Sequence, residues 1–247
     1  MSSKWVVITG ASSGIGKATA LKFAQEGYRI CLIARRTHHL KQVLTQIQAI
    51  TPFPSIQSQM IACDLSTDEG IDLVIDTLKG ESIQYLLHNA ATIQPITQLL
   101  EISRQEWRHH FTLNVEAPLF ITQALISELK GGRVMQISSG AAHKSIAGWG
   151  AYCASKATLY RIWASLKEEL HGHQIALASV RPGVVDTEMQ QEIRHATHPS
   201  FVQRPYFEDL KKKNQLISSA DVADYLFDLF VHRSREEFSA HEWDIRD

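Results

Sequence analysis

Short apolar segments alternate with longer amphipathic segments along most of the chain. The apolar segments cover residues 5–9, 29–34, 55–62, 83–88, 132–138 and 175–180. Between them, stretches such as 15–27 and 68–80 repeat apolar residues at the i, i+3, i+4 and i+7 spacing of one helix face and end in glycine. The apolar segments show little polar alternation, which is typical of strands buried on both faces. The pattern predicts an α/β fold, a single Rossmann-type doubly wound domain over residues 1–247 with a parallel sheet and helices on both faces.

Two segments interrupt this alternation. Residues 181–219 follow an apolar segment and are too long for an ordinary connection, so we expect an irregular substrate-binding lid at about 186–217. The chain ends in EFSAHEWDIRD at 237–247, after a helical pattern at 220–232. We expect this ending to add a last strand at the edge of the sheet.

Composition and charge narrow the classes of partner. The 247 residues are 44% hydrophobic and carry a formal net charge of −1, which gives no global field for nucleic acid or anionic lipid. We interpret the lysines at 211–213 as a solvated face. No apolar run approaches the roughly 18 residues that span a bilayer, and the amino terminus lacks the pattern of a signal sequence. We expect a cytoplasmic protein that binds neither nucleic acid nor membrane.

The cysteines and histidines give no sign of a disulfide framework or a metal site. The three cysteines, Cys31, Cys63 and Cys153, form no CxxC pair, and the first two lie in strand-like segments, as expected for reduced buried thiols. The twelve histidines include pairs at 38–39 and 109–110, but none has the spacing of a metal-ligand motif. We interpret these histidines as surface or core residues.

The first apolar segment runs directly into a glycine-rich turn that opens a helical pattern. The turn reads GASSGIG at 10–16. Glycines allow a tight turn and the close approach of a pyrophosphate, whose charge the free N–H groups and the dipole of the helix start would hold. The alternative is a purely structural turn. We expect a dinucleotide to bind at six residues of the turn: Gly10, Ser12, Ser13, Gly14, Ile15 and Gly16.

Arg35 and Arg36 follow the second apolar segment, where a dinucleotide-binding fold meets the adenosine ribose. NAD-specific sites carry an acidic residue there, whereas two guanidinium groups suit the 2′-phosphate of NADP(H). The sequence therefore favours NADP(H), and the alternative is that both arginines simply end a strand at the surface. Asp64 follows the third segment, where it would either cap the helix that begins near Ser66 or accept the adenine amino group.

Six short motifs together resemble the short-chain dehydrogenase/reductase family. They are TGASSGIG at 9–16, HNAA at 88–91, Asn114, ISS at 137–139, YCASK at 152–156 and RPG at 181–183. The resemblance runs in order over nearly the whole chain, and the length and the ending HEWDIRD are loosely similar to those of sepiapterin and benzil reductases. It implies a seven-stranded parallel sheet, a nicotinamide cofactor and catalysis by Asn114, Ser139, Tyr152 and Lys156.

The resemblance also implies further cofactor contacts, and the chain departs from the family at two places. The family commonly has Asn-Asn-Ala-Gly where this chain has HNAA at 88–91, so we expect a slightly different loop geometry there. A glycine often seen three residues after the catalytic serine is Ala142 in this chain. The implied cofactor contacts are Leu65, Asn89, Ala90, Tyr152, Lys156, Pro182, Gly183, Val185 and Thr187.

The proposed chemistry depends on Tyr152 and Lys156, which lie one helical turn apart and can address one object. A tyrosine pKa is about 10, and we expect the Lys156 cation, with the oxidised nicotinamide ring, to lower it. Tyr152 would donate a proton to the carbonyl oxygen while Ser139 supplies a second hydrogen bond. Pro118 has no N–H for the Asn114 carbonyl, which is then free to hold a water that relays protons to Lys156. The alternative is an ordinary proline kink with Asn114 exposed.

These features predict an NADPH-dependent oxidoreductase that reduces a small-molecule carbonyl, a ketone or diketone, to an alcohol. The alternatives are a 3-oxoacyl-thioester reductase of fatty acid synthesis and a non-catalytic regulatory protein that senses NADP(H). A thioester reductase would offer basic residues to an acidic carrier protein, and the lysine run is the one obvious basic cluster. We expect assembly into a homodimer or homotetramer.

Large apolar side chains crowd the segments that would form the substrate pocket. They favour a hydrophobic substrate such as an aromatic ketone or diketone. The alternative is that these rings pack the lid against the body or form a subunit interface. The expected substrate contacts are Ser139, Trp149, Tyr152 and Met189, and the other large residues are Phe201, Tyr206 and Phe207.

Overall fold

Seven parallel strands form a single sheet in the computed structural model, which describes residues 4–53, 55 and 57–247. The strand order is β3-β2-β1-β4-β5-β6-β7, and every neighbouring pair is parallel. This order confirms the doubly wound α/β fold. It also brings the ends of β1 and β4 together where the strand order reverses, which is where such sheets bind ligands. The strands are β1 (Trp5–Thr9), β2 (Arg29–Ala34), β3 (Gln59–Ala62), β4 (Ile83–His88), β5 (Arg133–Ile137), β6 (Ala176–Arg181) and β7 (Glu242–Asp244).

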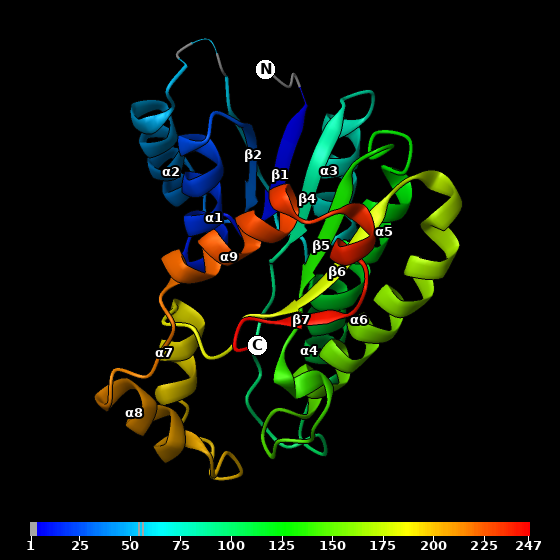
Figure 1. Ribbon diagram of the computed structural model, residues 1–247. Coiled ribbons are helices and arrows are strands. Elements are labelled where there is room, and N and C mark those ends of the chain that lie inside the picture. The colour runs from blue at the N-terminus through cyan, green and yellow to red at the C-terminus, as the bar shows by residue number, and fades with distance from the viewer. Residues whose placement is uncertain (1–3, 54, 56) are drawn as a thin grey trace.

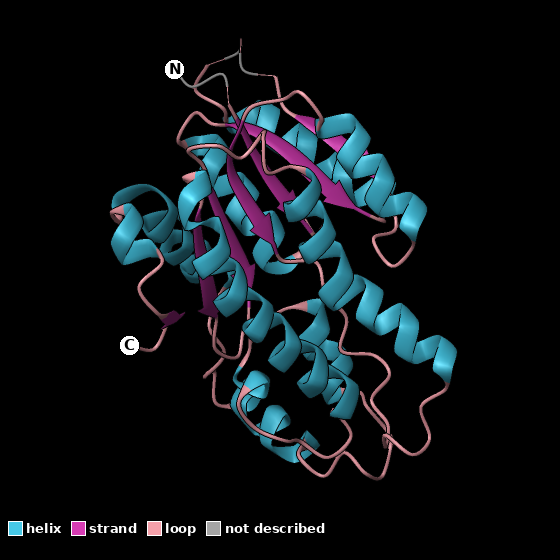
Figure 2. Ribbon diagram, turned by 90° about the vertical axis from the view of Figure 1, so that its right-hand side faces the viewer, coloured by secondary structure: helices cyan, strands magenta, loops and turns pink. Residues whose placement is uncertain are grey.

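Helices cover both faces of the sheet, as Figures 1 and 2 show. One face carries α1 (Gly14–Gln25), α2 (Thr37–Ile50) and α9 (Ser219–His232). The opposite face carries α3 (Asp68–Leu78), α5 (Ala117–Ala124) and α6 (Gly150–Glu169). Two further α-helices are α4 (Arg104–Phe111) and α10 (Arg235–Phe238). Within the described part of the chain, no helix combines the length and the apolar character needed to cross a membrane.

The side chains of β1 alternate between two separate apolar layers. Val6 and Ile8 pack with Phe23 of α1 in the cluster on one face. Trp5 and Val7 belong to the cluster on the other face. Because both layers are apolar, the strand reads as an uninterrupted hydrophobic segment and not as an alternating one.

The two edges of the sheet differ from each other. The strand that we predicted over 55–62 begins only at Gln59, and residue 56 of that prediction lies outside the described residues. Just before β3, the Ser58 hydroxyl accepts the Ile30 N–H at 3.1 Å and so replaces a backbone bond of the ladder. At the opposite edge β7 pairs with β6, which confirms the predicted last strand.

The segment at 186–217 contains two helices, α7 (Glu188–Arg194) and α8 (Arg204–Lys212), which lie beyond the carboxyl ends of the strands (Figure 1). The prediction of an irregular segment at 186–217 is therefore wrong. Helix α7 has seven residues, too few to show a helical period in the sequence. Its start depends on Thr187, whose side chain accepts the Gln190 N–H. The role of this segment as a lid stays a prediction.

Candidate active site

The glycine turn lies between the ends of β1 and β4. A Cβ atom on Gly16 would come within 2.5 Å of the Gly10 carbonyl oxygen and 2.6 Å of the Asn89 amide nitrogen, so a larger residue does not fit. Gly14 has φ +53°, which disfavours other residues there. Among the described residues, the Ser13 side chain makes no capping bond to α1, so the first-turn N–H groups stay available. The free N–H groups of this uncapped helix start, next to glycines that have no side chains, fit the pyrophosphate of a dinucleotide.

Asn89 and Ala90 lie directly against the glycine turn. The Thr9 hydroxyl accepts the N–H groups of both residues at 3.0 Å. The Asn89 amide in turn donates to the carbonyls of Thr9 and Gly10 at 3.0 and 3.3 Å. These bonds hold the ends of β1 and β4 together. The Asn89 side chain therefore shapes the turn, and a direct contact of Asn89 or Ala90 with the cofactor stays a prediction.

His88, the departure from the family motif, is buried beside this turn. Its Nε2 atom lies 2.8 Å from the Thr122 hydroxyl, which donates its own proton to the Pro118 carbonyl at 2.8 Å. Nε2 must then carry a hydrogen, and burial lowers the pKa of His88 to about 3. His88 is thus a neutral core residue that ties β4 to α5.

Arg36 points at the two serines of the glycine turn. Its Nη2 atom donates to the hydroxyls of Ser12 and Ser13 at 3.0 and 2.8 Å. Its Nη1 atom lies 2.7 Å from a carboxylate oxygen of Glu188, the first residue of α7. The guanidinium and the two hydroxyls form a donor cluster that fits a 2′-phosphate. The sequence analysis missed Glu188, because it lies far along the chain from Arg36.

Arg35 pairs with Asp64 at 3.3 Å, and its side chain is largely exposed. Burial acts to raise the pKa of Asp64, but hydrogen bonds from Ser66 and Arg35 hold it below its usual value. The Asp64 carboxylate accepts the Ser66 N–H and hydroxyl at 3.0 and 2.6 Å. The expected helix cap is wrong, because Thr67 caps α3 by accepting the Gly70 N–H. A contact of Asp64 with the adenine stays a prediction, as does one of its buried neighbour Leu65.

Tyr152 and Lys156 are buried on the first turns of α6, with 8% and 3% of their surface exposed. The ammonium nitrogen of Lys156 lies 5.7 Å from the centre of the Tyr152 ring and donates to the Ile137 carbonyl at 2.7 Å. Burial lowers the pKa of Lys156 to about 8. The spacing that the sequence showed therefore does bring both side chains to one place.

Ser139 lies at the end of β5, where its hydroxyl accepts the Ala141 N–H at 3.1 Å. Burial raises the pKa of Tyr152 to about 12, and a hydrogen bond with Ser139 opposes that rise. The lowered tyrosine pKa that we expected from Lys156 is not found in the protein alone, because desolvation of the phenolate outweighs the other effects. Tyr152 is accordingly a protonated phenol at neutral pH.

Asn114 lies in η1 (Thr112–Glu116), a π-helical turn between α4 and α5. Pro118 follows in the first turn of α5 and cannot donate to the Asn114 carbonyl. The Asn114 side chain is 1% exposed, so the alternative of an exposed asparagine is wrong. Its amide pairs with the backbone of Thr92, accepting from the N–H and donating to the carbonyl at 2.9 Å each. The relay of protons through a water at the Asn114 carbonyl stays a prediction.

His110 and Ser155 surround the rest of the Asn114 amide, and the sequence analysis assigned neither to the site. The Asn114 nitrogen lies 2.9 Å from His110 Nε2 and 3.2 Å from the Ser155 hydroxyl oxygen. A signal was present in the sequence, because His110 precedes Asn114 by four residues and so faces the same side of the helix. The pattern of the sequence marks His110 only as part of the histidine pair at 109–110.

The residues after β6 bring Thr187 against the glycine turn. Gly183 has φ +72°, and Pro182 precedes it. Val185 is buried and pairs with Ile217 through an isolated bridge. The Thr187 methyl group lies 3.0 Å from the position of a Cβ atom on Gly14. Val185 and Thr187 are thus close to the predicted pyrophosphate site, and their cofactor contacts stay predictions.

Trp149 and Met189 belong to an apolar cluster that joins α6, α7 and α8. The Trp149 ring, 6% exposed, stacks on Phe201 and Phe207 with centroid distances of 5.4 and 5.3 Å. The aromatic residues thus pack the 186–217 segment against the body, as the alternative stated. Tyr206 is exposed. A substrate contact of Trp149 or Met189 stays a prediction.

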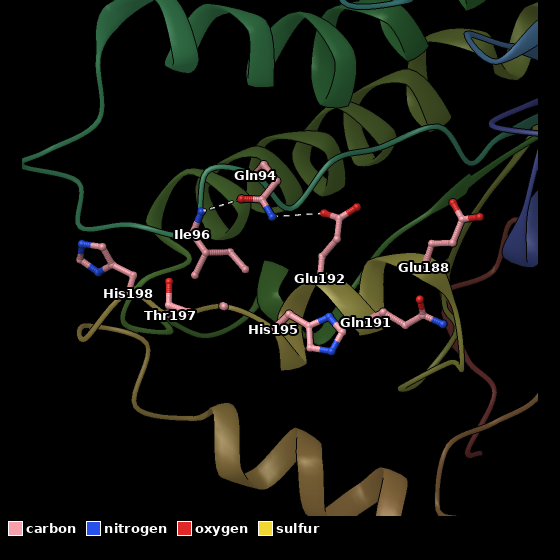
Figure 3. Close-up of a pocket in the computed structure, with 9 residues that line it drawn as sticks. Gln94, Ile96, Glu188, Gln191, Glu192, His195, Thr197 and His198 are labelled. Atoms are coloured by element: carbon pink, nitrogen blue, oxygen red, sulfur yellow. Dashed lines mark hydrogen bonds between the residues drawn. The ribbon is translucent and has the colours of Figure 1, made fainter.

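A cavity of about 630 Å³ lies between the 94–96 segment and α7 (Figure 3). Gln94 bridges it by donating to Glu192 of α7 at 3.2 Å. Ile96 belongs to the same apolar cluster as Tyr152, but none of the four predicted catalytic residues, all of which the structure describes, lines the cavity. Most of its lining is polar: Gln94, Ile96, Glu188, Gln191, Glu192, His195, Ala196, Thr197 and His198.

Comparison with known proteins agrees with this arrangement. A benzil reductase ((S)-benzoin forming) from Bacillus subtilis (strain 168) is 31% identical over 236 residues, which cover 90% of this chain and 91% of the relative. A second one, from Bacillus cereus, is 28% identical over 248 residues and 97% of each chain.

Solved structures share the fold. A short chain dehydrogenase/reductase from Saccharomyces cerevisiae matches with a TM-score of 0.86 at 27% identity, covering 99% of this chain and 96% of its own. A metagenomic short-chain oxidoreductase in complex with NADP has a TM-score of 0.74 at 26% identity, with 98% and 95% covered. The family model described as short chain dehydrogenase matches residues 4–198. The chain therefore belongs to the short chain dehydrogenase family.

Proposed function

We propose that this protein is an NADPH-dependent carbonyl reductase that converts a ketone or diketone into an alcohol. The observation that carries the proposal is the buried pair on α6, with the Lys156 ammonium 5.7 Å from the centre of the Tyr152 ring and with the Ser139 side chain acting to lower the pKa of the phenol. A proton donor, a second hydrogen-bond donor and a cation thus converge beside a turn that fits a dinucleotide.

The chain's own residues supply the proton and the electrostatics of the reduction. Bound NADPH would supply the hydride. Tyr152, protonated at neutral pH, donates its phenolic proton to the carbonyl oxygen as negative charge develops there. Ser139 donates a second hydrogen bond to the same oxygen and stabilises that charge. Lys156, held by the Ile137 carbonyl, stabilises the phenolate that Tyr152 leaves behind.

The choice of NADPH over NADH is supported by the arginines at the end of β2. Arg36 and the hydroxyls of Ser12 and Ser13 form one cluster of hydrogen-bond donors. Arg35 adds a second guanidinium group, which also pairs with the Asp64 carboxylate. The NADP complex of the metagenomic relative agrees with this preference.

The benzil reductases of the two Bacillus species support a ketone or diketone as the substrate. The proposal of a hydrophobic substrate rests on these relatives. The aromatic side chains no longer argue for it, because Trp149 stacks on Phe201 and Phe207 and all three are used in packing. The thioester alternative is weaker, since Lys211 and Lys213 pair with Asp186 and Asp209 at 2.7 Å each. With two of its three lysines paired in this way, the run offers less positive charge to an acidic carrier protein. Assembly into a homodimer or homotetramer stays a prediction.

The test is a steady-state assay of cofactor oxidation with both NADPH and NADH. The substrates are benzil, aliphatic ketones and 3-oxoacyl thioesters. We expect turnover of ketones or diketones with NADPH and a much lower kcat/KM with NADH. A preference for thioesters would favour the fatty acid synthesis alternative. Tight NADPH binding without turnover of any carbonyl would favour the sensing alternative and contradict the proposal.

A further inference from the structure

His110 is a completely buried histidine that lies next to the proposed catalytic groups. Its side chain is 0% exposed, on the last turn of α4. The ring lies 6.4 Å from the Tyr152 ring, centre to centre, and nearly perpendicular to it at 89°. Both ring nitrogens have polar partners, so the orientation of the ring is fixed by hydrogen bonds as well as by packing.

The partners of His110 define which nitrogen carries the hydrogen. Nδ1 lies 2.7 Å from the Gln94 carbonyl oxygen, which can only accept, so Nδ1 is the donor. Burial lowers the pKa of His110, which keeps the ring neutral. Nε2 is therefore an acceptor. The Asn114 amide donates to it at 2.9 Å, and the Ser155 hydroxyl oxygen lies 3.0 Å away, with its own proton donated to the Tyr152 carbonyl at 2.9 Å.

This arrangement uses every hydrogen-bonding group of the Asn114 side chain. The oxygen accepts from Thr92 N–H and one N–H donates to the Thr92 carbonyl. The other N–H faces His110 and Ser155. With its side chain held on these sides, Asn114 can act in the reaction only through its backbone carbonyl. The orientation of that carbonyl depends on the π-helical turn that the side chain anchors.

The same ring also ties the cavity wall to the catalytic helix. His110 holds the Gln94 carbonyl, while the Gln94 side chain reaches Glu192 of α7 at 3.2 Å. On its other side His110 meets Ser155, the residue directly before Lys156. One side chain thus connects α4, α6 and the segment at 92–94.

We propose that His110 is a positioning residue of the reductase, which fixes Asn114 and the 92–94 segment relative to Tyr152 and Lys156. The inference rests on the proposed function for its kinetic consequence. Without the Nε2 acceptor, a buried N–H of Asn114 loses a partner, and the π-helical turn shifts. A misplacement of this kind lowers kcat, whereas the predicted phosphate contacts of NADPH at the glycine turn and Arg36 stay in place and keep its affinity unchanged.

Three substitutions separate the two hydrogen bonds of the ring. His110→Asn keeps a donor at the position of Nδ1 but removes the acceptor for Asn114. His110→Gln places an amide at the position of Nε2 and can restore that acceptor. His110→Leu removes both bonds at similar volume. His109→Leu is the matched control, because His109 is the exposed neighbour on the same helix.

The first measurement is kcat and KM for benzil with NADPH, together with the Kd of NADPH. We expect His110→Leu and His110→Asn to lower kcat by about ten- to a hundredfold, the scale of a small misplacement far from the chemistry. Both should leave the Kd of NADPH within twofold. His110→Gln should recover most of the lost kcat, and His109→Leu should match the wild type. A kcat within twofold of wild type in His110→Asn would overturn the proposal, as would losses in His110→Gln equal to those in His110→Leu.

The second measurement is independent of turnover. Hydrogen exchange at the Thr92 amide reports on its bond to Asn114. We expect this amide to exchange faster in His110→Asn than in the wild type, whereas the amides of β1 should exchange at the same rate in both proteins. Unchanged exchange at Thr92 would overturn the positioning role. If the wild-type protein reduced no carbonyl, the proposed function would fail, and the exchange measurement would still decide whether His110 holds Asn114.

Discussion

Two helical regions border the predicted site, and they are stabilised in different ways. The predicted catalytic pair lies on α6, whose side chains at 152 and 156 are buried and whose apolar face packs in the core. Helix α7 has seven residues, and its polar face lines the cavity. Polar pairs hold that face, such as Arg36–Glu188 at 2.7 Å and Gln94–Glu192 at 3.2 Å.

The difference separates the helix that carries the predicted catalytic pair, α6, from the helix that borders the cavity, α7. Exposed ion pairs contribute about 0–1 kcal/mol each, so the polar face of α7 can change partners at small cost. A buried cation or phenol has no such freedom, because moving it would require a new set of partners in the core. We infer that the reaction is carried by the rigid body and that cofactor and substrate compete with the contacts of α7. The predictions below test each side of this comparison.

The largest effect is expected at the phenol on the rigid side. Tyr152→Phe keeps the ring but removes the proton donor, so kcat should fall by roughly 10²- to 10⁴-fold while NADPH still binds. Steady-state kinetics and a cofactor titration measure the two quantities. Tyr160→Phe, on the same helix, is the control. A variant that kept a tenth of the wild-type rate would make Ser139 the first candidate for the acid.

The next effect concerns the arginines proposed to bind the 2′-phosphate. Replacing Arg35 and Arg36 with alanine should weaken NADPH binding by about ten- to a hundredfold, since hydrogen bonds to charged groups contribute about 1.5–3 kcal/mol. NADH binding should change little, because NADH lacks the 2′-phosphate. Isothermal titration with both cofactors measures the difference, and Arg104→Ala on α4 serves as the control. Equal losses for both cofactors would show that the arginines do not recognise the phosphate.

A third effect is a pH dependence of the core. The pKa of His88 is lowered to about 3 in the folded protein, below the value of about 6.5 expected in the unfolded chain. Between these values the unfolded state binds the proton and the folded state does not, so stability falls as pH decreases from about 6.5 toward 3. The slope contributed by one such group is about 1.4 kcal/mol per pH unit.

Denaturant unfolding at several pH values checks this slope. His88→Asn removes the titrating ring and should flatten the dependence over the same range, whereas exposed His109→Leu should not. A wild-type stability that stays constant from pH 6.5 to 4.5 would contradict a neutral, buried His88.

The smallest effect is expected at α7. Glu188→Gln removes the carboxylate that shares Arg36, so NADPH should bind about two- to fivefold more tightly, in line with an exposed pair of about 1 kcal/mol or less. The unfolding free energy should change by less than about 1 kcal/mol for the same reason. Glu208→Gln on α8 provides a control that leaves Arg36 untouched. Weaker NADPH binding in Glu188→Gln would mean that the carboxylate orients Arg36 and does not compete for it.

The features that the sequence predicted well are those set by local backbone geometry. The glycine turn at 10–16 follows a strand and opens a helix, and the Tyr152–Lys156 spacing directly places two side chains on one helix face. The parallel sheet with helices on both faces also followed from the repeated strand–helix pattern, because parallel strands need helical crossovers.

The features that the sequence did not predict depend on contacts between distant segments. The pairing of Arg36 with Glu188 joins β2 to α7, and Trp149 stacks on rings more than fifty residues away. The tyrosine pKa depends on burial, which no local motif reports. Thr67 displaced Asp64 as the cap of α3 because the helix begins at Asp68, and helix boundaries are poorly defined in a sequence.

The most direct test of the central claim follows the hydride. Wild-type protein is incubated with benzil and NADPH carrying deuterium at C4 of the nicotinamide, with each C4 position labelled in turn. We predict that deuterium from one of the two labelled positions appears on the carbinol carbon of the product, and that Tyr152→Phe slows this transfer by the factor given above for kcat while still binding NADPH. Product that forms without deuterium from either label, or no product from any ketone or diketone tested, would contradict the account.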